Sequence, residues 1–156
     1  MTPSSKRTSL IAALAALAAS GFVALDCLAA GEPANASPSS RRPVSVLEFG
    51  ALGVGVLKAA PAFGDRATGQ HGTFVKIPAG FSSPVHAHTA DFHGVVINGV
   101  IANGAPEESD TPLAPGSYWF QPANRMHVTK CLSQTECAIF LVQPGKFDFV
   151  PAAAAK

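Results

Sequence analysis

The sequence predicts an all-β fold for the region that follows its N-terminal segment. Short β-prone runs alternate with turn residues from about residue 44 onward, and the chain contains 14 glycines and 13 prolines. No helical period of useful length occurs in this region. About ten closely spaced strands in roughly 110 residues are typical of a β-barrel or β-sandwich. The glycines and prolines then mark the corners between strands.

Each strand is expected where an apolar or β-branched run is bounded by turn residues. Asn98-Gly99 is the strongest two-residue hairpin signal available, so we expect the runs on either side of it to pair. Residues 104–112 are polar and acidic and are expected to form a surface loop. The expected strands are 44–49, 54–58, 73–77, 84–88, 93–97, 100–103, 117–121, 127–130, 137–143 and 146–150.

The first 36 residues have the features of a secretory signal peptide. Lys6 and Arg7 form a positive n-region, residues 10–25 are an almost unbroken apolar run, and an A-x-A motif stands at 34–36. A retained membrane anchor is the alternative, because about 20 apolar residues can span a bilayer. The run is rich in alanine, however, and Asp26 interrupts it, so removal is the favoured interpretation.

This interpretation divides the chain into three parts and predicts a periplasmic or secreted protein. Residues 1–36 are the signal peptide and cleavage region, 37–43 are a linker, and 44–156 are one folded domain. No stable membrane association is expected once the signal is removed. The net charge is +1 and no basic cluster lies outside the N-terminus, which argues against a nucleic-acid partner.

Export also determines how the cysteines are interpreted. Cys131 and Cys137 would remain after cleavage as a pair in an oxidising compartment, separated by a polar stretch that a hairpin could close. A metal-binding thiolate pair is the alternative, but the spacing exceeds the usual two to four residues. A structural disulfide is therefore predicted.

Four of the five histidines occur at two places in the chain. His86 and His88 flank one residue in an expected strand, so both imidazoles should lie on the same face. His93 follows after four residues, and His127 comes much later, after a Pro-Ala-Asn turn. His71 lies in a glycine-rich stretch and is expected to be unrelated. Imidazole groups in such a set are suited to Zn, Cu, Fe or Ni.

The histidines and their neighbouring glycines resemble the first motif of the cupin superfamily. That motif runs glycine, five residues, His-x-His, three or four residues, glutamate, six residues and glycine. This chain offers Gly80, His86, His88, then His93 in place of the glutamate, and Gly99 one residue early.

The second cupin motif, Pro-x-Gly, two residues, His, is matched by Pro122 and His127, with Asn124 in place of glycine. Asparagine also adopts the left-handed conformation that glycine favours, so this change is mild. The stretches HAHTADFHGVVINGV and PGSYWFQPANRMHVTKC are similar to a family of small exported cupins without a known function. The resemblance covers residue 73 to about 151.

The resemblance implies a jelly-roll β-barrel that holds one divalent transition metal ion on His86, His88 and His127. His93 is a possible fourth ligand, although it could also turn away or support another ligand. Asp91 is the competing carboxylate. A site of histidines alone leaves the ion with a charge of +2, so it should favour a small anionic ligand that carries oxygen.

Two functions follow from this implied centre. The first is a metal-dependent enzyme of dioxygenase, lyase or isomerase type, with Asp91 and Arg125 as candidate catalytic residues. The second is a module that binds or senses a metal or small ligand without turnover. The expected partner is a small molecule, and homodimerisation through an edge strand at 44–49 is a further option.

Aromatic side chains in residues 117–121 are candidates for the wall of a ligand pocket, although core packing is the favoured interpretation. Tyr118 and Phe120 should share one strand face and Trp119 should take the other. One of these faces either lines a ligand pocket or belongs to the packed core.

Overall fold

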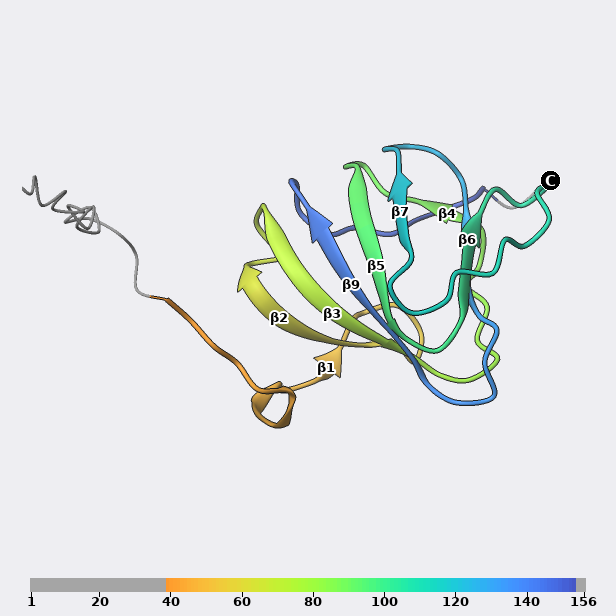
Figure 1. Ribbon diagram of the computed structural model, residues 1–156. Helices are drawn as coiled ribbons and strands as arrows, with labels where there is room; N and C mark the ends of the chain where they lie inside the picture. The colour runs from red at the N-terminus through yellow and green to blue at the C-terminus, as the bar shows by residue number, and fades with distance from the viewer. Residues whose placement is uncertain (1–38, 154–156) are drawn as a thin grey trace, which may run out of the picture. The chain divides into compact units, whose positions relative to one another are not determined.

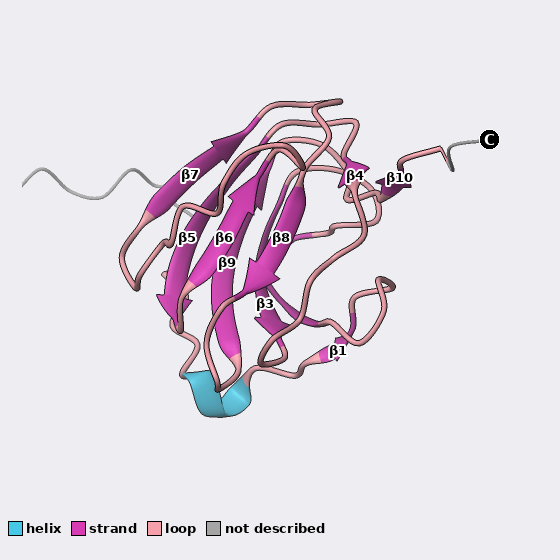
Figure 2. Ribbon diagram, turned by 90° about the vertical axis from the view of Figure 1, so that its right-hand side faces the viewer, coloured by secondary structure: helices cyan, strands magenta, loops and turns pink. Residues whose placement is uncertain are grey.

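The computed structural model describes residues 39–153, of which residues 40–153 belong to one compact unit. The predicted signal peptide and the first linker residues lie outside the described residues. The described elements are one 3-10 helix, η1 (Val44–Val46), and strands β1 to β10 (Figure 2). The all-β prediction is therefore confirmed. No helix within residues 39–153 is both long and apolar enough to cross a membrane.

Six antiparallel strands form the larger sheet, in the order β1-β2-β3-β9-β5-β7 (Figure 1). Strands that are distant in sequence are neighbours here, since β9 pairs with both β3 and β5 along most of its length. The bounds are β1 Gly50–Ala51, β2 Lys58–Gly64, β3 His71–Ile77, β5 Phe92–Asn98, β7 Tyr118–Gln121 and β9 Cys137–Gln143.

Two shorter strand pairs form the second layer. Strand β4 (His86–Ala87) pairs with β10 (Val150–Pro151), and β6 (Ile101–Gly104) pairs with β8 (Val128–Cys131). Isolated bridges between Ser82 and Lys130 and between His86 and His127 join the two pairs. His86, His88 and His127 lie in or directly beside the strands of this layer.

The core lies between the inward faces of both layers. Along residues 73–77 of β3 and residues 92–97 of β5 the side chains alternate between buried and more exposed positions, as a strand with one face on a core requires. Val75, Ile77, Val96 and Ile139 from the larger sheet meet Ile101 from the second layer. This apolar packing supplies the main stabilisation of the fold.

Two predicted strands near the start of the domain are wrong. Residues 44–46 form the 3-10 helix, with Val44 exposed and its carbonyl bonded to the Leu47 N–H. Residues 54–57 form a turn, and the strand begins at Lys58. Strand β2 is rich in alanine and contains Pro61, next to which its register with β3 shifts. The proposed edge strand for a dimer is thus absent from the described chain.

The predicted Asn98-Gly99 hairpin is also wrong. Strand β5 pairs with β7 and β9, whereas β6 pairs with β8, so the turn passes from one layer to the other. Gly99 has a φ of 75° and a Cβ there would lie 2.7 Å from the sulfur of Cys137. Glycine is needed because the backbone approaches the disulfide closely.

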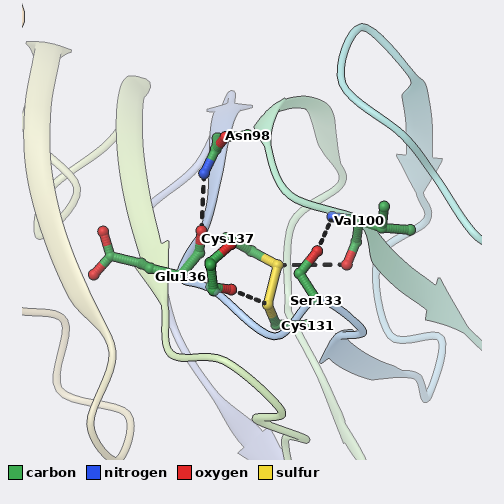
Figure 3. The surroundings of a disulfide bond; sticks show 7 residues. Asn98, Val100, Cys131, Ser133, Glu136 and Cys137 are labelled. Carbon is green, nitrogen blue, oxygen red and sulfur yellow. Dashed lines mark hydrogen bonds between the residues drawn. A yellow bond between two sulfur atoms is a disulfide. The ribbon is translucent and has the colours of Figure 1, made fainter.

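The predicted disulfide between Cys131 and Cys137 is present, with Cα atoms 5.9 Å apart (Figure 3). It joins the end of β8 to the start of β9, so it ties the two layers together rather than closing a hairpin. The intervening loop is fastened to the turn after β5, because the Val100 N–H donates to Ser133 Oγ and Asn98 Nδ2 donates to the Glu136 carbonyl.

Candidate metal centre

Three histidines from two distant parts of the chain meet inside the second layer. His86 lies in β4, His88 directly follows this strand, and His127 directly precedes β8. Their ring centroids are 4.2 Å apart for His86 and His127, 5.0 Å for His86 and His88, and 5.3 Å for His88 and His127. All three side chains are buried.

Backbone hydrogen bonds hold these positions in register. The His86 N–H donates to the His127 carbonyl at 3.1 Å, and the His127 N–H returns a bond to the His86 carbonyl at 2.8 Å. The Asn124 N–H donates to the His88 carbonyl at 2.7 Å. Asn124 has a φ of 60°, which agrees with the left-handed turn expected from the sequence.

The three Nδ1 atoms all face backbone carbonyls. His86 Nδ1 lies 2.9 Å from the Pro84 carbonyl, His127 Nδ1 lies 3.1 Å from the Arg125 carbonyl, and His88 Nδ1 contacts the Asp148 carbonyl. A carbonyl only accepts, so each Nδ1 must carry the proton. In a neutral ring the lone pair is then on Nε2. Metal-ligating histidines usually have this arrangement, with one nitrogen on the metal and the other ring N–H donated to a carbonyl or carboxylate.

Burial keeps these imidazoles neutral. Desolvation lowers the pKa of His86 and of His127 from 6.5 to about 4, although hydrogen bonds to carbonyls act in the opposite direction. The pKa of His88 is lowered for the same reason. Protons therefore compete with a metal ion for these rings only at a lower pH than they would for the ring of an exposed histidine.

The nitrogen atoms meet the requirement for a shared ion. One ligand atom from each histidine lies within 4.8 Å of the others, and Nε2 of His127 is buried without a hydrogen-bond partner among the described residues. An unpaired buried acceptor is costly. Coordination would satisfy it, since Zn–N bonds are about 2.0–2.1 Å and small ring movements would bring three nitrogens to one ion. The residues fit a divalent transition metal.

A cavity of about 50 Å³ opens beside the histidines. Most of its wall is aliphatic or aromatic, and no described residue in the wall is Asp, Glu, Lys or Arg. The wall consists of His86, His88, Ser83, Thr129, Leu52, Val54, Leu57, Val75, Ile77, Phe92, Trp119, Ile139, Leu141, Phe147 and Phe149.

A C-terminal segment that sequence reasoning did not assign to the site closes one side of it. Phe149 stacks on His86 with ring centroids 4.4 Å apart, and the Phe147 ring lies 5.3 Å from that of His88. The Asp148 carboxylate accepts the N–H and the hydroxyl of Thr89. No local signal marks these residues, because their contacts are with residues about 60 positions earlier.

Burial alone would raise the pKa of Asp148, but the Thr89 hydrogen bonds and the nearby His88 and Lys146 lower it overall. The Asp148 carboxylate is 3.9 Å from His88 Nδ1. This is not an ion pair at neutral pH, because the pKa of His88 is itself lowered. Asp148 therefore fixes the C-terminal segment and the orientation of the His88 ring.

The structure does not bring His93 to the other three histidines. Phe92 takes the inward position of β5, so strand alternation turns His93 to the exposed face. There its Nδ1 lies 2.8 Å from the Tyr118 hydroxyl, and its ring packs against Phe120. The role of possible fourth ligand is therefore not supported by this geometry.

The two candidate catalytic residues also lie outside the cavity wall. Asp91 is exposed, and its Oδ1 accepts the Ala123 N–H at 2.6 Å, which fixes the turn that precedes His127. Arg125 is exposed, and its guanidinium is 3.8 Å from the Glu108 carboxylate. Asp91 thus acts on the backbone of the turn, while the carbonyl of Arg125, rather than its side chain, contacts the histidine cluster.

His71, expected to be unrelated, begins β3 and is buried between Thr73 Oγ1 at 2.8 Å and Gln143 Oε1 at 3.3 Å. Burial lowers its pKa. It belongs to the packed polar end of the larger sheet and is absent from the cavity wall within the described region.

Comparison with known proteins identifies one matching family. The family described as "Domain of unknown function (DUF4437)" matches residues 53–156. None of the curated proteins matches the sequence.

Several solved structures are similar to this chain. The polyketide cyclase RemF from Streptomyces resistomycificus is 16% identical, with a TM-score of 0.64 over 76% of this chain and 89% of that one. An RmlC-like cupin from Shewanella frigidimarina NCIMB 400 is 19% identical, with a TM-score of 0.53 over 69% and 92%. The DMSP lyase DddQ from Ruegeria pomeroyi DSS-3 is 18% identical, with a TM-score of 0.57 over 69% and 62%. At these identities the likeness confirms the cupin fold.

Proposed function

Because the chain belongs to the DUF4437 family and has the cupin fold, we propose that it is an exported metal-dependent enzyme that acts on a small anionic, oxygen-bearing molecule. His86, His88 and His127 would hold one divalent transition metal ion. The observation that carries this proposal is the unpaired, buried Nε2 of His127 within a cluster of neutral imidazoles. Such a cluster next to an apolar cavity is a site for a metal and its ligand.

The chemistry of the donor set supports an anionic ligand. Three neutral imidazoles leave a divalent ion with its full charge, and no described residue in the cavity wall adds a carboxylate to reduce it. A divalent ion bound there would supply Lewis-acid polarisation of a ligand oxygen. The apolar wall excludes water around the bound molecule, and this strengthens the electrostatic interaction.

The protein's own residues hold this arrangement in place. Carbonyls of Pro84, Arg125 and Asp148 keep the proton of each imidazole on Nδ1. Phe147 and Phe149 cover two of the rings and limit access of water. This preorganisation means that little side-chain entropy is lost when the ion binds.

Two of the structurally similar proteins are named as a polyketide cyclase and a DMSP lyase. They support enzymatic activity on small molecules as one use of this fold, although fold alone does not select a reaction. Protein loaded with Fe(II), Zn(II), Ni(II) or Cu(II) should therefore be assayed for oxygen uptake and product formation with β-diketones and hydroxy acids. Complete inertness of every loaded form would refute the enzymatic proposal.

A second function, capture of a small ligand without turnover, is favoured by one observation. The described cavity wall contains no carboxylate or lysine, and the three Nδ1 atoms are bonded to carbonyls, so no general base faces the cavity. The spectrum of Co(II)-loaded protein should then change on addition of acetylacetone, which should be recovered unaltered. Chemical conversion of the added ligand would exclude this second function.

Export is also part of the proposal. A disulfide is present, and disulfides persist in oxidising compartments. We expect a mature protein in the periplasm or the medium that starts near residue 37, with residues 44–156 as its folded domain. N-terminal sequencing of protein from its natural compartment would test this. A mature protein that still contains residues 10–25 would contradict it.

A further inference from the structure

Two buried polar side-chain atoms lack a partner in the described part of the chain, one in the histidine cluster and one in the wall of the cavity beside it. One is Nε2 of His127, an acceptor that the proposed metal would satisfy. The other is Nε1 of Trp119, which is always a donor. Trp119 lines the cavity and is 8% exposed. The same Phe92 ring lies 6.3 Å from the indole and 5.9 Å from the His127 ring.

Local packing fixes the position of the indole. Trp119 in β7 is paired with Gly94 in β5, and a Cβ on Gly94 would lie 2.2 Å from Cζ2 of the indole. The ring therefore occupies the space that any larger residue at position 94 would take. A donor held in this way costs little entropy when it binds.

The other hydrogen-bonding side chains of the wall are already engaged. Ser83 Oγ accepts the Thr129 N–H at 2.9 Å, and Thr129 Oγ1 donates to Asn103 Oδ1 at 2.7 Å. The histidines donate through Nδ1 to carbonyls. Among the buried side-chain atoms of the described wall, Trp119 Nε1 is thus the one donor atom without any hydrogen-bond partner.

We propose that the Trp119 N–H is the second polar anchor of the site and donates a hydrogen bond to an oxygen of the molecule bound at the metal. This inference rests on the proposed metal centre. The cavity volume and the apolar wall then define the ligand class: a compact, mostly apolar molecule with an anionic oxygen group and a second oxygen acceptor. A short branched carboxylate has this chemistry, because it carries two oxygens, one for the metal and one for the N–H.

The test uses two small probes on Zn(II)-loaded protein. Isobutyrate offers a second oxygen acceptor, whereas imidazole binds a metal through one nitrogen and presents a donor at its far side. The chain contains one tryptophan, so it gives one indole ¹H–¹⁵N resonance. Isobutyrate should move the indole proton downfield, and imidazole should not do so.

The matched variant is Trp119→Phe, which keeps an aromatic ring but removes the donor. Its affinity for isobutyrate should fall about tenfold, as expected for loss of one hydrogen bond to a charged acceptor, while its affinity for imidazole stays within twofold. If the variant does not fold, the resonance of the unmodified protein remains decisive.

Failure of this inference can be told apart from failure of the metal centre. Absence of zinc from the loaded protein by elemental analysis would overturn both. Bound zinc with an indole resonance that isobutyrate does not move, or failure of isobutyrate to bind, would overturn the role of Trp119 alone. In that case the indole donates elsewhere, for example to the face of Phe92.

Discussion

Acidification of the metal-free protein should destabilise it through the buried histidines. Desolvation lowers the pKa of His86 and His127 to about 4 in the folded state, whereas the unfolded chain has the ordinary value of 6.5. The unfolded state therefore binds more protons between these values. The stabilising contribution is fully present above about pH 6.5 and is lost as the pH falls towards 4.

The size of the effect follows from these two values. At pH 5 the unfolded chain has protonated both rings almost completely, while the folded protein has barely begun to do so. Each histidine then lowers the free energy of unfolding by about 2 kcal/mol relative to pH 8. Together they remove about 4 kcal/mol, a large part of the 5–15 kcal/mol that stabilises a typical domain.

Urea denaturation in the presence of EDTA at pH 8 and pH 5 measures this difference. A His86→Gln/His127→Gln double variant should lose a large part of the pH dependence, because glutamine does not titrate. The remainder comes from His88 and His71, whose pKa values burial also lowers. His93→Gln is the matched control, since this histidine is exposed and lies outside the buried cluster. Equal stability of the unmodified protein at both pH values would refute the reasoning, as would a full pH dependence in the double variant.

Three further changes test the packing around the site. Replacing both Cys131 and Cys137 by serine should lower the free energy of unfolding by about 2 kcal/mol on the chain-entropy estimate, and unchanged urea midpoints would contradict this. Gly94→Ala should lower the free energy of unfolding by about 1–3 kcal/mol, because the new methyl group overpacks against the indole. Gly50→Ala should lower it far less, because there is open space around Gly50. Asn124→Ala should lower the free energy of unfolding by about 1 kcal/mol, because residue 124 has a positive φ. Asn124→Gly should not lower it, and equal thermal midpoints of the two variants would contradict this.

The histidine cluster could largely be anticipated from the sequence. Period-2 spacing places His86 and His88 on one face, and the second motif supplies His127. Their convergence depends on the bridge between His86 and His127, which joins residues 41 positions apart. Such a pairing is a property of the whole fold, and only the resemblance to the cupin motifs predicted it.

His93 takes one of the alternatives that the motif left open, since it turns away from the other histidines. Its spacing matches the glutamate of the family pattern, but a shift of one residue in a strand moves a side chain to the other face. Phe92 is the larger apolar residue and occupies the inward position, where its ring contacts His88 and His127. The burial of Phe92 therefore decides the direction of His93.

The C-terminal contribution to the site was not predictable from local patterns. Phe147, Asp148 and Phe149 were expected only as part of a tail strand, and their roles depend on the pairing of β10 with β4. The wrong hairpin at Asn98-Gly99 has a similar origin. The turn residues were identified correctly, but the layer that receives the next strand is set by long-range contacts.

Elemental analysis of variants tests the metal centre most directly. Protein purified from its natural compartment should contain one divalent transition metal ion per chain, bound by His86, His88 and His127. We predict that His127→Ala loses the ion while remaining folded, and that His93→Ala keeps it. Retention of a full equivalent of metal by His127→Ala, or its loss from His93→Ala, would contradict the assignment.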